Sequence, residues 1–434
     1  MDVGLVAAVI FLASIAAIVA RIVDETVAAL AGLVAMVLLT AYTPEDAFNY
    51  VDWNVIAILL GMWIIAGYMI EGGFTNATLR LVAKYATTYR RFLLLMAIFS
   101  GFISMFIDNV LVILLVGSIT IEAARRVGAN PILAILLIGF SANFMGTALL
   151  MGDLPPQLLH SVAGAEFIDF IWSYGRPSSF PLLTITFIIT LAAYYMIFIR
   201  REPNKPLDGV EARGEAKWHP LLLHVSLAFF TLTVIGMALR PLLGLPLGFI
   251  TLAGASMLAL VVELWRRAGG RLPSFEEALG HVEWRALLFY ATLFSLVGGL
   301  EELGVLEEVA SSVVGYISEP GLASYTVMYW IVGLLSLFVE HDALLLTFLY
   351  ITRDAAELAG INPWNIYWGM AWSATLASNA TTAAAPALYV AVAIAEDKGY
   401  RIRPTTFLKY SLTFASISLV VHYLVTIPFW SHPP

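Results

Sequence analysis

Two short stretches of this chain place acidic, amide and imidazole side chains inside apolar sequence. The first stretch contains Asp108 and Asn109 in FIDNVLVILL, and the second, far downstream, contains Glu340, His341 and Asp342 in LFVEHDALLL. A carboxylate at the centre of a bilayer costs roughly 2.5–3.5 kcal/mol on insertion scales, so one that is retained there is a functional candidate. Both stretches could bind a cation or exchange a proton, and two acids beside an imidazole suit a proton relay.

Structural roles are the alternative for these residues. Asp108 could cap the helix that follows it, and Asn109 could bond loop carbonyls. In the second stretch, either Glu340 or Asp342 could face the external water.

The composition predicts a membrane protein. The 434 residues are 60% hydrophobic and 12% charged, with a mean hydropathy of +0.86, against roughly 45–50% apolar residues in soluble domains. Apolar blocks recur along the chain, long enough for the ~20 residues of a spanning helix. The first block has no basic leader or cleavage site, so we expect a spanning helix there and not a removable signal.

The remaining composition excludes several classes of site and partner. The chain has no cysteine, which excludes disulfides and thiolate metal sites. Its net charge of −8 makes nucleic acid an unexpected partner. HExxH, GxSxG and P-loop motifs are missing from the sequence, so we do not expect an enzyme or a built-in ATPase. The expected surroundings are the lipid bilayer of the cell membrane.

The chain repeats itself. The stretch GFISMFIDNV…SITIEAARRVGANP, from Gly101, aligns without gaps with GLLSLFVEHD…YITRDAAELAGINP, from Gly333, and the identities include both Asn-Pro pairs. Loop charges of the two copies are opposite. The acidic residues Glu45, Asp46 and Asp52 correspond to the basic residues Arg266, Arg267, Arg271 and Arg285. Since Lys and Arg mark the cytoplasmic side, the two repeats should be inverted across the membrane.

The spacing of these features predicts an all-α polytopic membrane protein of two inverted repeats. About thirty residues between two basic stretches are too few for two crossings, which need ~40 residues, so each copy should contain a re-entrant hairpin. We predict about ten spanning helices, two opposed re-entrant hairpins near 92–121 and 322–351, and two broken helices near 131–160 and 363–395. The first repeat would cover 1–200, a cytoplasmic linker 201–217, and the second repeat 218–434.

The two predicted breaks supply further candidate residues. SANFMGTALLMGDLPPQLL, from Ser141, and SATLASNATTAAAPALYV, from Ser373, are rich in small and hydroxyl residues and contain prolines. Paired interruptions in inverted halves are the best sequence pointer to a transporter's binding site. The candidates are Asn143, Thr147, Asp153, Ser378, Asn379, Thr381 and Thr382. They could instead satisfy the broken backbone, and Asp153 could be only a helix cap.

These motifs resemble the ion transporter superfamily, which includes arsenite permeases, D-type sodium/proton antiporters, the melanosomal P protein and citrate-type carriers. The resemblance rests on Ser-x-Phe-x-Asp-Asn at the first tip, the downstream Asn-Pro, and Asn-x-x-Gly-Thr…Gly-Asp-x-Pro at the first break. In the second half, VEWRALLFYATLFSLVGGLEELG and the SNAT motif resemble the same family, so the similarity covers nearly the whole chain. The Asp-Asn tip is closer to the P-protein, arsenite and sodium/proton branch than to the dicarboxylate branch.

The resemblance implies a secondary active transporter that forms a homodimer through its scaffold helices. This sequence departs from the family pattern at the second tip, where Glu340 and His341 replace the usual Asp-Asn, and at Leu149, where a threonine is usual. The architecture is therefore expected to carry over, while the transported ion or solute stays open.

Charge favours a cation or a neutral hydroxide as the cargo. No Lys or Arg falls in the predicted tips or breaks. The leading expectation is Na+/H+ antiport or arsenite efflux, without a cofactor and with H+ or Na+ as the coupling ion. Asp108, Asn109, Asn143 and Asn379 form the candidate Na+ site. Helix N-termini can bind anions, so a Na+- or H+-coupled carrier of carboxylates or inorganic anions is the alternative. An ion channel, the alternative of another class, would need a continuous polar stripe.

Overall fold

A computed structural model describes residues 3–20, 22–207, 219–317 and 321–434. The first half contains α1 Val3–Val19, α2 Glu25–Leu39, α3 Pro44–Asn49, α4 Trp53–Glu71, α5 Phe74–Tyr85, α6 Tyr89–Ser104, α7 Asn109–Val127, α8 Pro131–Gly146, α9 Leu154–Ala163, η1 Phe167–Phe170, β1 Trp172–Ser173, β2 Arg176–Pro177, α10 Ser179–Ile197 and η2 Ile199–Arg201. Strands β1 and β2 form a small antiparallel hairpin. Residues 208–217 of the predicted linker lie outside the described residues.

The second half repeats this order of helices. It contains α11 Pro220–Ala238, α12 Arg240–Leu243, α13 Leu247–Arg267, α14 Phe275–Leu279, α15 Trp284–Glu302, α16 Val305–Ile317, α17 Leu322–Leu335, α18 His341–Ala359, α19 Trp364–Ser378, α20 Pro386–Asp397 and α21 Pro404–Trp430. The chain is thus an all-α polytopic membrane protein, as the sequence predicts. Among the described residues, five helices are long and apolar enough to cross a membrane singly, and the bent α15–α16 pair would make a sixth span.

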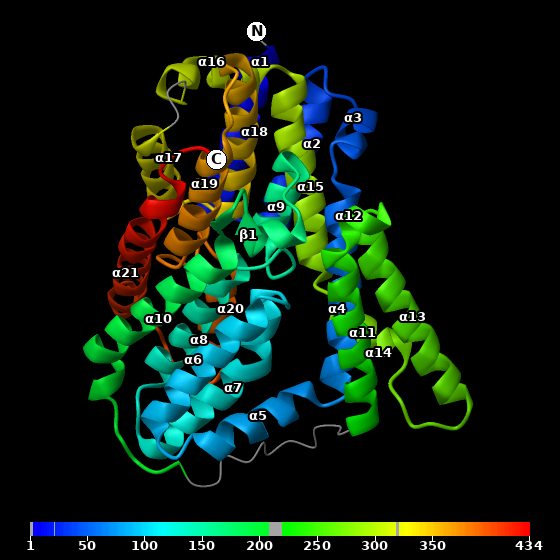
Figure 1. Ribbon diagram of the computed structural model, residues 1–434, viewed down its shortest axis with the longest axis vertical. Helices are drawn as coiled ribbons and strands as arrows, with labels where there is room; N and C mark the ends of the chain where they lie inside the picture. The colour runs from blue at the N-terminus through cyan, green and yellow to red at the C-terminus, as the bar shows by residue number, and fades with distance from the viewer. Residues whose placement is uncertain (1–2, 21, 208–218, 318–320) are drawn as a thin grey trace.

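The two halves share their helix-ending signals. Helices α7 and α18 begin at matching positions of the two repeats, and each ends at a glycine in the left-handed conformation, Gly128 (φ +70°) and Gly360 (φ +65°). Glycine tolerates this conformation without a Cβ clash, which explains why the two glycines are identical in the repeats. In Figure 1, α7 runs toward the lower end of the molecule and α18 toward the upper end, as inversion requires. The re-entrant placement of both hairpins stays a prediction.

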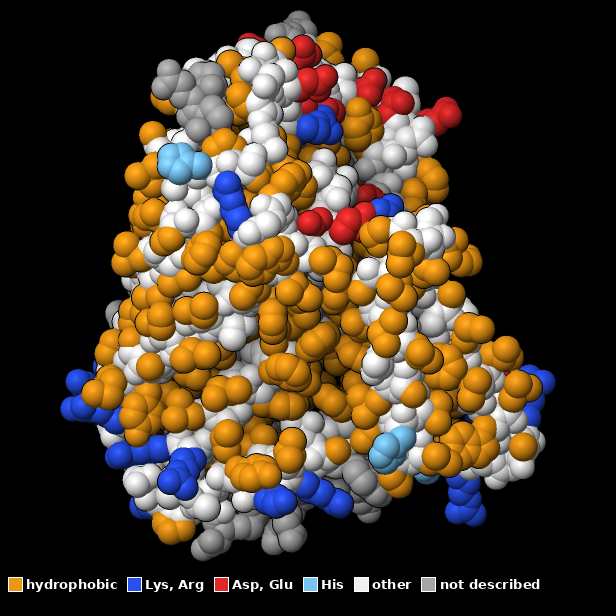
Figure 2. Space-filling view, viewed as in Figure 1, with side chains coloured by type: hydrophobic (Ala, Val, Ile, Leu, Met, Phe, Trp, Pro, Cys, Tyr) orange, Lys and Arg blue, Asp and Glu red, His pale blue; other side chains and the backbone are white. Residues whose placement is uncertain are grey.

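Charged side chains gather at opposite ends of the molecule. Figure 2 shows Lys and Arg mainly along the lower end, Asp and Glu mainly at the upper end, and an apolar band between them. This is the distribution expected of a protein that crosses a bilayer. By the positive-inside rule, the lower end is the expected cytoplasmic side.

The two broken helices form the centre of the core. Residues 133–146 of α8 and 365–378 of α19 are all buried, so neither helix has a face toward lipid or water along these residues. The second part of each broken helix packs on the opposite repeat. Helix α9 contacts α18 and α19, while α20 contacts α7 and α8. Each hairpin tip therefore lies beside elements of both repeats.

Candidate functional site

The first hairpin tip is built on a helix cap. Asp108 is the N-cap of α7, and its Oδ1 accepts hydrogen bonds from the backbone N–H groups of Val110 (2.9 Å) and Leu111 (3.3 Å). The structural role that the sequence left open for Asp108 is therefore real. The same side chain, only 6% exposed, also lines a cavity, so capping does not use all of its surface.

Asn109 connects the first tip to both parts of the first broken helix. Its Nδ2 donates to Oδ1 of Asn143 in α8 (3.2 Å) and to Oδ2 of Asp153 at the start of α9 (2.7 Å). Asp153 is the N-cap of α9, where its Oδ1 accepts from the N–H of Leu154 (2.9 Å). The capping role considered for Asp153 is thus present, together with a second role as partner of the tip.

Side chains also join the two broken helices to each other. Nδ2 of Asn143 donates to Oγ of Ser378 (2.9 Å) and to the carbonyl of Thr375 (3.3 Å), and the hydroxyls of Thr147 and Thr375 lie 2.7 Å apart. All four side chains are buried. The sequence-based prediction missed Thr375, although it occupies the position that matches Asn143 in the repeat.

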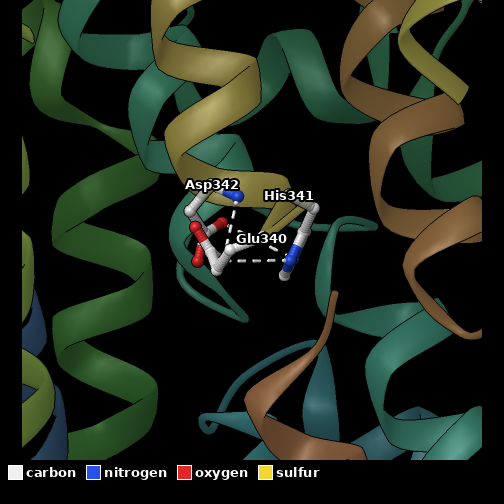
Figure 3. Close-up of side chains that lie close together, drawn as sticks. All are labelled: Glu340, His341 and Asp342. Atoms are coloured by element: carbon white, nitrogen blue, oxygen red, sulfur yellow. Dashed lines mark hydrogen bonds and ion pairs between the residues drawn. The ribbon is translucent and has the colours of Figure 1, made fainter. Parts of the chain in front are cut away.

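The second tip carries its acids and its imidazole on consecutive residues (Figure 3). Glu340 is the N-cap of α18 and accepts from the N–H groups of Asp342 (3.1 Å) and Ala343 (2.8 Å). Nδ1 of His341 lies 2.8 Å from the carbonyl oxygen of Ala384 and 3.3 Å from Oε1 of Glu340, and its Nε2 lies 3.5 Å from Oδ1 of Asp342. Each of the three is 1% exposed, so the alternative that an acid faces external water is wrong.

Three of the predicted residues surround this tip or its break. Oγ1 of Thr381 donates to the carbonyl of Leu337 (2.8 Å) and accepts from the N–H of Ala384 (3.2 Å). Asn379 is fully buried, and within the described part of the chain neither its Oδ1 nor its Nδ2 has a hydrogen-bond partner. A buried unpaired amide costs about 1–3 kcal/mol, which marks Asn379 as a candidate ligand. Thr382 lines the same cavity as Asp108.

The two tips share one acidic region. Asp153 interacts electrostatically with His341 and Glu340, although it belongs to the other repeat. Oxygen and nitrogen ligand atoms of the second-tip residues Glu340, His341 and Asp342 lie within 4.8 Å of one another, a spacing that could hold a metal ion. The predicted Na+ set is only partly brought together: Asn109 bonds Asn143, while the hydrogen bonds of Asp108 go to its own helix. That site stays a prediction.

A cavity of about 530 Å³ adjoins Asp108 and contains residues that the sequence-based prediction missed. It is lined by Ile18, Ile22, Val23, Asp24, Glu25, Asp108, Val110, Glu283, Arg285, Ala286, Phe289, Tyr290, Thr382, Ala383, Pro386, Tyr389 and Val390. Tyr290, on α15, interacts electrostatically with Asp108, Asp153, Glu340 and Asp342. The sequence signal that could have identified Tyr290 is its place in VEWRALLFY, which belongs to one of the stretches that resemble the family.

Two inverted halves with broken helices, and polar groups gathered at the breaks, define a membrane transporter. The model of the family described as "Citrate transporter" (CitMHS) matches residues 15–377, and the chain belongs to this family. The "Uncharacterized transporter Rv2684" of Mycobacterium tuberculosis is 28% identical over 98% of both chains. The magnetosome protein MamN of Magnetospirillum gryphiswaldense is 26% identical over 78% of this chain and 76% of its own.

Two solved transporter structures have the same fold. Neisseria gonorrhoeae MtrF, described with a class of antimetabolite efflux pumps, gives a TM-score of 0.64 at 14% identity and covers 92% of this chain and 85% of its own. The Alcanivorax borkumensis YdaH transporter gives 0.61 at 14% identity over the full length of both chains. Likeness at this identity bears on the fold and not on the cargo.

Proposed function

We propose that this protein is a secondary active transporter that exchanges protons for a small cation, by Na+/H+ antiport, or that expels arsenite against protons. The observation that carries the proposal is the shared acidic region at the two tips. Asp108, Asp153, Glu340 and Asp342 are buried there with a single imidazole, and none of their hydrogen bonds within the described residues involves Lys or Arg. Such a set can be neutralised by protons or by a cation.

The helix N-termini at the two tips favour a cation over an anion. Helices α7, α9, α18 and α20 all begin at a tip or a break, and their N-terminal N–H groups could in principle hold an anion. Three of these N-termini are already capped by carboxylates, from Asp108, Asp153 and Glu340, and only α20 begins without a side-chain cap. An arriving anion would meet negative charge at three of four positions.

Within this proposal, the two tips alternate between a protonated and a cation-bound state. The hydrogen bonds from Asn109 to Asn143 and Asp153 tie the first tip to its break, so a change of charge at the tip is felt by α8 and α9. We expect both hairpins and both broken helices to move together against the remaining helices. Those remaining helices would form the homodimer interface in the cell membrane.

A carrier of carboxylates coupled to H+ or Na+ is the second candidate. The description of the family favours it, and the uncapped N-terminus of α20 offers one place for an anionic group. In that case the acids at the tips would bind coupling ions and not the cargo.

Transport by purified protein in liposomes loaded with a pH-sensitive dye tests both candidates. Proton movement is recorded after addition of Na+ or Li+, then arsenite, then citrate or sulfate, and each is repeated with Asp108→Asn. Asparagine is as good a cap as aspartate, so this variant removes charge and preserves the helix start. We expect Na+ or arsenite to move protons and the variant to be inactive. Transport of citrate alone, with an active variant, would establish the carboxylate carrier.

A further inference from the structure

Acidic residues other than Asp108 also line the cavity beside it. Glu283 and Arg285, at the start of α15, and Asp24 and Glu25, at the turn between α1 and α2, line it together with Asp108. Four carboxylates therefore face one guanidinium around a space of about 530 Å³. The cavity has room for a hydrated ion, and residues of the N-terminal turn, of α15 and of the first hairpin tip all line it.

The guanidinium of Arg285 is already engaged by two of these carboxylates. It lies 2.5 Å from Oδ2 of Asp24 and 3.3 Å from Oε1 of Glu25. Arg285 also interacts electrostatically with Glu283, but the described residues contain no hydrogen bond between the two side chains. Asp108 and Glu283 are the remaining carboxylates, and they interact electrostatically with each other.

Only one of the two carboxylate oxygens of Asp108 takes part in capping. Both capping hydrogen bonds of Asp108 go to its Oδ1, from Val110 and Leu111. Within the described residues its Oδ2 has no hydrogen-bond partner, although the side chain is only 6% exposed. Because the side chain lines the cavity, this second oxygen is available to a ligand that enters it.

The repeat reveals that Glu283 is not needed as a cap. Its counterpart in the first half is Asp52, the N-cap of α4, whose Oδ1 accepts from the N–H groups of Asn54 (2.9 Å) and Val55 (3.1 Å). Glu283 is the N-cap residue of α15, yet its side chain makes no capping hydrogen bond and lines the cavity instead. The same position thus has a capping carboxylate in one repeat and a carboxylate that caps nothing in the other.

Two residues further along, the two repeats also differ in the role of the side chain. Asn54 in the first half is held by its contacts, because its Oδ1 accepts from the N–H of Gly248 (2.7 Å) and its Nδ2 lies 3.2 Å from Nε2 of His160. Arg285 replaces it in the second half and faces the cavity. In the first half both side chains make structural hydrogen bonds, whereas in the second half both are charged and line the cavity that also contains Asp108.

We propose that Asp108 and Glu283, which line the same cavity from α7 and α15, form a binding site for a small monovalent cation that precedes the hydrogen-bonded cluster at the two tips. The inference rests on the proposed cation-for-proton exchange and adds a residue and a place to it. Two carboxylate oxygens from different helices suit a hard cation, which prefers oxygen ligands. The ion pair of Arg285 with Asp24 and Glu25 keeps the guanidinium from neutralising Glu283 fully.

The test compares Glu283→Gln with Asp52→Asn in the full-length protein. Neither change removes a structural hydrogen bond: glutamine replaces a carboxylate that caps nothing, and asparagine retains the cap of α4. Binding of radioactive Na+ to the purified protein, with Li+ as competitor, is measured together with thermal unfolding. We expect about tenfold weaker Na+ binding for Glu283→Gln, because the site loses one of its two charges, and unchanged binding for Asp52→Asn.

The outcomes separate this inference from the proposed function. Equal Na+ binding by Glu283→Gln and Asp52→Asn, with proton movement still lost in Asp108→Asn, overturns the role of Glu283 and leaves the exchange intact. Proton movement driven by arsenite, without any Na+ or Li+ binding, likewise overturns the cation site alone. Transport of citrate only, without cation binding by the unsubstituted protein, overturns both.

Discussion

The two hairpin tips have the same frame and different chemistry. Asp108 and Glu340, which occupy matching positions of the two repeats, each cap the second helix of a hairpin through two backbone N–H groups. The next residue differs. Asn109 binds side chains of the break in its own repeat, whereas His341 binds the backbone carbonyl of Ala384. The duplicated residue builds the turn, and the residue after it decides what the tip can bind.

The difference between the tips follows from their partners at the breaks. Asp153 accepts from Asn109, but the corresponding position in the second half is Ala385, which has no acceptor in its side chain. The second tip has its acids on Glu340 and Asp342 instead. Beyond the capping acid that both tips share, the additional acid therefore lies at the break in the first repeat, as Asp153, and on the hairpin itself in the second, as Asp342.

The largest expected effect concerns how closely the first tip approaches its break. A Cβ at Gly152 would lie 2.4 Å from the carbonyl oxygen of Gly146 and 2.5 Å from that of Ser104. Because backbone atoms cannot move aside cheaply, we expect Gly152→Ala to lower the free energy of unfolding by about 3 kcal/mol. The corresponding residue is Ala384, so Ala384→Gly should cost only about 1 kcal/mol. Thermal unfolding of both variants measures the contrast, and equal losses would show that the tips are equally close.

The next effect concerns the carboxylate that only the first break has. Asp153→Ala removes the cap of α9 and an acceptor of Asn109, and we expect a loss of about 2 kcal/mol in the free energy of unfolding. Asp153→Asn keeps the capping oxygen and should lose less. Denaturant titration of the purified variants gives both values. A stable Asp153→Ala variant would mean that Asn143 alone holds the tip.

A third prediction makes the second tip resemble the first. His341→Asn gives the second tip the acid-Asn pattern of the first tip and removes the imidazole. Ala385, at the position that matches Asp153, is left unchanged. We expect the rate of proton movement in liposomes to fall at least about tenfold, because no other group at this tip combines donor and acceptor near neutral pH. Thermal unfolding serves as the control for folding. An unchanged rate in a folded variant would make His341 structural.

The smallest expected effect is at Thr381, whose hydroxyl bonds the carbonyl of Leu337 and the N–H of Ala384. Thr381→Val should lower the free energy of unfolding by about 1 kcal/mol. The matched control is Thr413→Val, since among the described residues the hydroxyl of Thr413 bonds only the carbonyl of Lys409 in its own helix, at a partly exposed position. We expect less than about 0.5 kcal/mol there. Equal losses in the free energy of unfolding for the two variants would mean that the hydroxyl of Thr381 does not stabilise the second tip.

Local features of the fold could be read from the chain alone. Both predicted breaks fall where small residues and prolines interrupt the apolar runs, after Gly146 at the end of α8 and after Ser378 at the end of α19. The two left-handed glycines and the Asn-Pro pairs at helix ends act within one turn of backbone. Such signals depend on neighbours in sequence, so a single sequence contains them.

Contacts between the repeats could not be read in this way. The bonds of Asn143 to Ser378 and to Thr375, and the approach of Asp153 to His341, join residues that lie in different halves of the chain. Glu283 and Tyr290 belong to an ordinary apolar helix in the sequence, and only packing brings them to the same cavity as Asp108. The sequence by itself determined the repeat, its inversion and the capped tips, because these depend on local backbone and charge. Tertiary structure decided which tip meets which break, because helices α9 and α20 each pack against the hairpin of the other repeat.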